Sequence, residues 1–116
     1  MKQIVITGGL GYIGTELCKI YSGYSWNYKI TVIDNRFISE RVNQLRNWNI
    51  NFVHGDILDK DLVNETCFDA DIIHHLAGIT DVPRVEKDAN SDQEEKIRIV
   101  AEEGTQNILD AIKEVK

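Results

Sequence analysis

Short apolar runs alternate with amphipathic stretches along the whole chain. Runs rich in β-branched residues predict strands, and apolar residues three or four positions apart predict helices between them. We expect strands at residues 2–7, 29–34, 50–54 and 71–76, and helices at 12–22, 59–67 and 91–115, with a short helix after residue 37. This alternation predicts an α/β fold of the Rossmann type, with a parallel sheet of about four strands in the order 3-2-1-4 and flanking helices.

Local signals mark the ends of several elements. Gly23 is typical of a residue that ends a helix, and Ser91 is a good N-cap for the last helix. The polar segment 80–92, which contains Pro83, predicts a long loop. The first helix is indicated by apolar residues at helical spacing: Ile13, Leu17, Ile20 and Tyr24.

The composition predicts one small domain spanning residues 1–116. The chain is 42% hydrophobic and 28% charged, as in folded soluble proteins. No apolar run reaches the roughly 18–20 residues of a membrane span, and Met1-Lys2 leads directly into a strand rather than a signal peptide. Cys18 and Cys67 lack metal-ligand spacing and suit a reducing compartment. We expect a cytoplasmic protein with no membrane partner and no metal site.

The net charge of −6 argues against nucleic acid as a partner. Residues 1–55 carry six basic and three acidic residues, whereas residues 56–116 carry seven basic and sixteen acidic residues. The acidic half is interpreted as mostly solvated helix surface. The N-terminal half is therefore the part where an anionic ligand would be tolerated.

A glycine-rich turn joins the first strand to the first helix. Gly9, Gly11 and Gly14 fit the G-x-G-x-x-G dinucleotide fingerprint in the context that it requires. Gly9 permits the tight turn, Gly11 leaves room for a pyrophosphate, and Gly14 lets the helix lie close to the strand. The helix N-terminus offers free N–H groups and partial positive charge, so we expect a dinucleotide to bind here.

An acidic residue ends the second strand, twenty residues after Gly14. The Asp34 carboxylate can accept hydrogen bonds from the adenosine ribose and would repel a 2′-phosphate, which favours NAD over NADP. Arg36 leaves the choice less clear, because a nearby arginine can accommodate a 2′-phosphate.

Two further motifs follow the third and fourth strands. Asp56 could accept from the adenine amino group with Ile57 against the ring, although aspartates are common in such turns. His74 and His75 are adjacent on a strand and point to opposite faces, so we expect one to pack in the core and one to face a helix.

These motifs together resemble the NAD-dependent epimerase/dehydratase family of extended short-chain dehydrogenases/reductases, which acts on nucleotide sugars. They follow the family's order over almost the whole chain: residues 7–14 (Thr-Gly-Gly-Leu-Gly-Tyr-Ile-Gly), Asp34-Asn35, Gly55-Asp56-Ile57, His75-Leu76-Ala77-Gly78 and residues 104–109.

The resemblance implies a role for each matched position. The turn around Gly8, Gly11 and Gly14 would hold the pyrophosphate of NAD, flanked by Tyr12 and Ile13. The adenosine ribose would lie among residues 34–39, which include Asp34, Asn35 and Arg36. Adenine would meet Asp56 and Ile57, and the path to the nicotinamide ribose would be lined by Leu76, Ala77 and Gly78.

The chain also departs from the family. It has no tyrosine after Tyr28, so the catalytic Tyr-x-x-x-Lys pair is absent, and Ala101 stands where the family commonly has asparagine. The matched region stops where a fifth strand would begin, so we expect residues 1–116 to contain no substrate lobe. We expect an NAD-binding N-terminal portion, truncated relative to the family, that is inactive alone and would act on a nucleotide sugar only if completed by further chain.

Two structural consequences and one alternative follow. The fourth strand would be an open edge, and the last helix would carry apolar surface suited to a homodimer. The alternative is a stand-alone dinucleotide-binding module with a regulatory or protein-interaction role.

Overall fold

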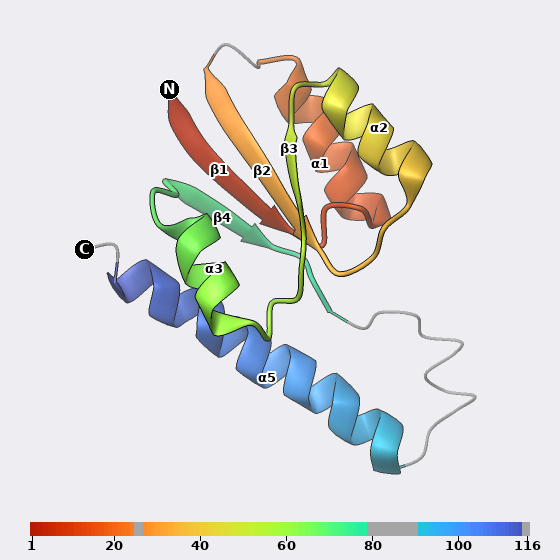
Figure 1. Cartoon of the computed structure of the whole chain (residues 1–116), viewed down its shortest axis with the longest axis vertical. Coiled ribbons are helices and arrows are strands. Elements are labelled where there is room, and N and C mark those ends of the chain that lie inside the picture. The colour runs from red at the N-terminus through yellow and green to blue at the C-terminus, as the bar shows by residue number, and fades with distance from the viewer. Residues whose placement is uncertain (25–26, 79–90, 115–116) are drawn as a thin grey trace.

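The computed structural model describes residues 1–24, 27–78 and 91–114, which form one sheet with helices on both faces (Figure 1). The strands are β1 (Lys2–Thr7), β2 (Tyr28–Asp34), β3 (Asn51–His54) and β4 (Ile72–His75). The helices are α1 (Tyr12–Ser22), α2 (Ser39–Asn47), α3 (Lys60–Cys67) and α5 (Ser91–Glu114). Most of the expected loop 80–92, including Pro83, and the expected helix end at Val115 lie outside the described residues.

The sheet is parallel and has the order β3-β2-β1-β4, which confirms the predicted topology. Ile4 in the centre of the sheet pairs with Ile30 on one side and with Ile72 on the other. Within the described part of the chain β4 is an edge strand, as expected. Because all strands run the same way, their carboxyl ends lie along one edge, where the predicted motifs follow them.

The sheet separates two hydrophobic cores. Helices α1 and α2 cover one face, and α3 and α5 cover the other (Figure 1). Neighbouring residues of a strand point to opposite faces, so Ile4 and Ile6 enter the first core while Val5 enters the second. The first core includes Leu10, Cys18, Val32, Val42 and Leu45, and the second includes Ile33, Ile57, Val63, Cys67, Ile108 and Ala111.

Helix α1 does not bury the apolar stripe that indicates it in the sequence. Its buried residues are Gly14 and Cys18, whereas Ile13 is 72% exposed and Ile20 is 62% exposed. The helix lies so close to the glycine turn that only a small residue fits at its inner face, as described below for Gly14. Ile13 and Ile20 are on the outer side, whereas Leu17 and Tyr21 are partly buried against the first core.

Helix α5 carries exposed apolar side chains, as the sequence predicts. Leu109 is 47% exposed and Ile112 is 39% exposed, although Ile108 and Ala111 are buried against the sheet. In residues 1–24, 27–78 and 91–114, no helix has the length and apolar character needed to cross a membrane.

Candidate dinucleotide-binding site

The turn after β1 depends on Gly8 for its backbone conformation. Gly8 has a φ of 72°, in the left-handed region that favours glycine, so the tight turn that we expected at Gly9 is made one residue earlier. The Gly8 N–H donates to the carbonyl oxygen of Ile33 (2.8 Å), and the Gly11 N–H donates to that of Gly8 (3.1 Å). Gly9 is needed for space instead, because a Cβ there would lie 2.4 Å from Cγ1 of Val32.

Gly14 brings α1 close to the turn, as predicted. A Cβ at this position would lie 2.6 Å from both the carbonyl oxygen of Gly8 and the Cα of Gly9. Gly11 differs, because a Cβ there would come no closer than 3.4 Å to any neighbour. Gly11 is therefore less crowded than Gly14, and a methyl group there would make only ordinary van der Waals contacts with the described residues.

The N-terminus of α1 is open to an anion. Gly11 is its N-cap, no side chain caps it, and its first turn contains no acidic residue. Helix α3 differs on both counts, because the Asp59 carboxylate accepts the Leu62 N–H and Asp61 lies in the first turn. Uncapped N–H groups and the helix dipole favour phosphate, so α1 rather than α3 has the properties of an anion site.

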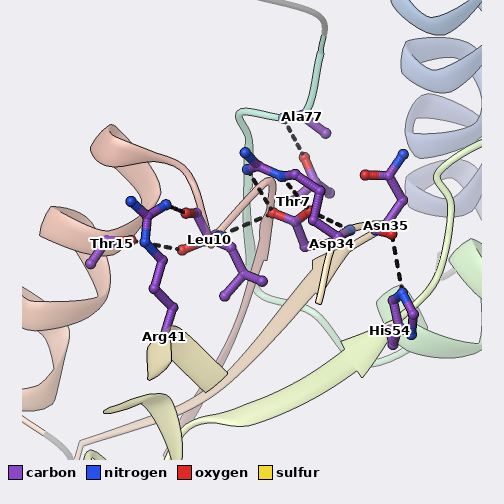
Figure 2. A network of polar contacts seen from close by, with 10 residues as sticks. Thr7, Leu10, Thr15, Asp34, Asn35, Arg41, His54 and Ala77 are labelled. Carbon is purple, nitrogen blue, oxygen red and sulfur yellow. Dashed lines mark hydrogen bonds and ion pairs between the residues drawn. The ribbon is translucent and has the colours of Figure 1, made fainter. Parts of the chain in front are cut away.

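Two guanidinium groups lie beside the turn. Arg41 on α2 donates from Nη1 to the carbonyl oxygen of Leu10, and its Cζ lies 5.3 Å from the centre of the Tyr12 ring (Figure 2). The Tyr12 ring is 84% exposed. Arg36 lies on the other side of the turn, where its Nη2 would be 3.6 Å from a Cβ on Gly11. Arg41 adds to the positive potential at the end of α1, whereas the charge of Arg36 is paired with the carboxylate of Asp34.

Asp34 ends β2 next to the turn and is almost completely buried. Its Oδ2 accepts the Leu10 N–H at 3.1 Å (Figure 2), and its Oδ1 accepts the Arg36 N–H at 2.9 Å. The Arg36 side chain adds two bonds of 3.2 Å, from Nε to Oδ1 and from Nη2 to Oδ2. The carboxylate thus joins β2 to the glycine turn, and the exposed Asn35 that follows accepts a hydrogen bond from Nε2 of His54 (3.1 Å).

The turn after β3 places Asp56 and Ile57 differently. Asp56 is exposed, and its Oδ1 accepts the Leu58 N–H at 3.0 Å. The Ile57 side chain is 5% exposed and points into the second core, where a Cβ on Gly104 would lie 2.4 Å from its Cδ1. Because α5 covers this side chain, the predicted contact of Ile57 with adenine stays a prediction that falls to its backbone.

The end of β4 is tied to β1 and α5 by His75. Ala77 N–H donates to Thr7 Oγ1 (3.1 Å), Thr7 Oγ1 lies 2.7 Å from His75 Nδ1, and His75 Nε2 lies 3.1 Å from Thr105 Oγ1. Each threonine hydroxyl can donate or accept, so in either tautomer the neutral imidazole accepts from one threonine and donates to the other. A neutral imidazole therefore satisfies both hydrogen bonds of the His75 ring.

His74 points to the other face of the sheet, as the alternation of a strand predicts. Its Nε2 lies 2.7 Å from the hydroxyl of Tyr21 on α1. The two histidines therefore point to opposite faces, as predicted, but each contacts a helix and both are only partly buried, so the expectation that one packs in the core is not met. Beyond β4, a Cβ on Gly78 would have no neighbour within 4 Å among the described residues.

We expect His75 to make stability depend on pH. Burial lowers the pKa of its imidazole below the ordinary value of about 6.5. The unfolded chain then binds more protons than the folded protein between these two pKa values, so the free energy of unfolding falls as pH drops below about 6.5. Chemical denaturation at pH 7.5, 6.5 and 5.5 measures this slope.

Replacing His75 by glutamine should flatten that slope relative to the wild type. His54→Gln is the matched control, because His54 is exposed and donates only to the Asn35 carbonyl among the described residues. Equal slopes in the His75→Gln variant and the wild type would contradict the assignment.

The fold and the site define the class of protein to which this chain belongs. A parallel sheet of this order, with a glycine turn after β1 and an acidic residue at the end of β2, is a Rossmann-type unit. Residues 5–116 match the model of the 3-beta hydroxysteroid dehydrogenase/isomerase family. The chain belongs to this family, within the NAD-dependent epimerase/dehydratase group of extended short-chain dehydrogenases/reductases.

Individual relatives agree with this assignment. The dTDP-D-glucose 4,6-dehydratase of Dictyostelium discoideum is 32% identical over 123 residues, which cover 100% of this chain and 27% of the relative. UDP-glucose 4-epimerase from Brucella ovis, solved in complex with NAD, matches with a TM-score of 0.77 and 28% identity over 99% of this chain and 33% of its own. A dTDP-glucose 4,6-dehydratase from Streptomyces venezuelae, with NAD and TYD bound, has a TM-score of 0.80 at 22% identity, covers 97% of this chain and 36% of its own, and supports the fold. The chain thus spans about a third of the length of the relatives it matches.

Three polar residues of this site were not singled out by sequence reasoning. Thr7, Thr105 and Arg41 each bind a group that is distant along the chain, so spacing does not reveal them. The sequence signals for the two threonines were the matched motifs that contain them, which are residues 7–14 and the Gly104-Thr105 pair. The structure explains that pair, because Gly104 makes room for Ile57 and Thr105 binds His75.

Proposed function

We propose that this chain is the NAD-binding portion of a nucleotide-sugar epimerase or dehydratase. The observation that carries the proposal is the uncapped N-terminus of α1 directly beside the buried Asp34 carboxylate, joined by the Leu10 N–H. A diphosphate at the helix end and a ribose at the carboxylate are the two anchors that a dinucleotide needs. The relatives solved with NAD support the choice of cofactor.

The proposed contacts hold successive parts of the cofactor along the carboxyl edge of the sheet. The N–H groups at the start of α1 would hold the pyrophosphate, Asp34 the adenosine ribose, and Asp56 the adenine amino group. The path past Leu76, Ala77 and Gly78 would lead to the nicotinamide ribose. Bound NAD would supply hydride transfer, whereas this chain's own residues bind and orient it.

The chain is proposed to bind NAD by itself but not to turn over a nucleotide sugar. No tyrosine follows Tyr28, so the sequence offers no Tyr-x-x-x-Lys pair as a general base. The exposed Leu109 and Ile112 support self-association through α5, for which a monomer by sedimentation equilibrium would be contrary evidence. The two free, buried cysteines support a cytoplasmic location.

Titration calorimetry with NAD, ADP-ribose and nicotinamide mononucleotide tests this function. We expect NAD and ADP-ribose to bind with similar affinity, because the proposed anchors contact the ADP-ribose half, and nicotinamide mononucleotide to bind much more weakly. No heat from NAD or ADP-ribose at millimolar concentration would overturn the proposal. Interconversion or dehydration of UDP-glucose or dTDP-glucose by the purified chain would overturn the claim of inactivity.

A further inference from the structure

The carboxylate that should receive the ribose is already saturated within the protein. Asp34 accepts four hydrogen bonds, from the N–H groups of Leu10 and Arg36 and from Nε and Nη2 of Arg36. An ionised carboxylate offers about four lone-pair sites. A ribose diol can therefore reach Asp34 only by displacing the two guanidinium bonds, since the two backbone bonds belong to the turn itself.

The ion pair is strongly asymmetric in exposure. The Asp34 side chain is 3% exposed, whereas the Arg36 side chain is 52% exposed. The pair thus presents its positive end outward, beside Gly11, where Arg36 Nη2 would lie 3.6 Å from a Cβ. An incoming 2′-phosphate would meet an exposed guanidinium and a neutralised carboxylate instead of a bare negative charge. Arginine is well suited to such a phosphate, because its donors match phosphate oxygens in pairs.

We propose that Arg36 is a specificity-determining residue that weakens the discrimination between NAD and NADP. With NAD, the ribose hydroxyls displace the guanidinium from Asp34, which costs part of the binding energy. With NADP, the guanidinium stays near Asp34 and pairs with the 2′-phosphate. The wild-type chain should consequently bind the two cofactors with affinities within about tenfold of each other, a smaller gap than an unpaired aspartate would produce. This inference rests on the proposed dinucleotide site.

The test is calorimetry of NAD and NADP binding to the wild type, Arg36→Ala and Arg36→Lys. Arg36→Ala should shift the ratio of dissociation constants by about tenfold or more toward NAD, because NADP loses its counter-ion and meets a bare carboxylate. Arg36→Lys should retain part of the NADP affinity, because it keeps the charge without the paired donors. Arg46→Ala is the matched control, since it removes one exposed positive charge from α2 and should leave the ratio unchanged.

The outcomes separate the two proposals. If the wild type binds neither NAD nor NADP, the proposed function fails. If NAD binds but Arg36→Ala leaves the ratio of the NAD and NADP dissociation constants unchanged, the role of Arg36 is overturned and the dinucleotide site stands. The same holds if the wild type binds NADP more than about a hundredfold more weakly than NAD. Thermal melts of each variant show whether it is folded, and a misfolded Arg36→Ala leaves Arg36→Lys as the deciding variant.

Discussion

Gly14→Ala should destabilise the protein by about 3 kcal/mol or more, because the new methyl group would overlap backbone that cannot move independently. Its Cβ would lie 2.6 Å from the Gly8 carbonyl oxygen and 2.6 Å from the Gly9 Cα. Relief requires α1 to move away from the end of β1, which also displaces the helix N-terminus from the turn. The midpoint and slope of urea denaturation measure the loss, and NAD affinity should fall with it.

Gly11→Ala is the matched control for this prediction. The same methyl group at Gly11 would meet nothing closer than 3.4 Å, and the residue's φ of −75° is accessible to alanine. We expect less than about 1 kcal/mol of destabilisation from the poorer N-cap, together with weaker NAD binding, since the methyl group enters the space assigned to the pyrophosphate. Equal losses of stability in the two variants would contradict the close approach of α1 at Gly14.

Asp34→Asn should weaken NAD binding by about tenfold to a hundredfold, because the ribose would lose a charged acceptor. The change should also lower the free energy of unfolding by about 1–2 kcal/mol. The asparagine side chain has one acceptor oxygen in place of two, so the Leu10 N–H or the Arg36 N–H is left facing an NH₂ group. Calorimetry and urea denaturation of the same sample measure both effects.

Asp69→Asn provides the comparison for Asp34→Asn. Asp69 is exposed and lies after α3, so its substitution removes the same charge without touching the turn. We expect NAD affinity and stability close to those of the wild type. If NAD affinity is unchanged in Asp34→Asn, the carboxylate does not bind the ribose and its proposed role is wrong.

The element order was predictable because it depends on local signals. Apolar runs of four to seven residues, separated by glycine and by polar stretches, mark the four strands, and their alternation with helices implies the parallel order β3-β2-β1-β4. The position of Asp34 at the end of β2 followed from the same pattern.

The details of the site depend on contacts between residues that are distant along the chain, so they were harder to predict from the sequence. Several glycines in a row allow more than one turn; in the structure Gly8, beside Ala77, takes the left-handed conformation, and Gly9 lies against Val32. Ile57 was expected at the ligand because it follows Asp56, but the approach of Gly104 on α5 turns its side chain inward. Periodicity within one segment contains no information about such neighbours.

The two cores on opposite faces of the sheet allow the two ends of the site to vary separately. The glycine turn is anchored in the first core through the buried side chain of Leu10, and the Asp56 turn in the second through Ile57. Substitutions that share no partners and lie more than about 7–10 Å apart have nearly additive effects. Substitutions in α1 and α2 can thus change the proposed phosphate contacts, and substitutions in α3 and α5 the proposed adenine contacts, without one change undoing the other.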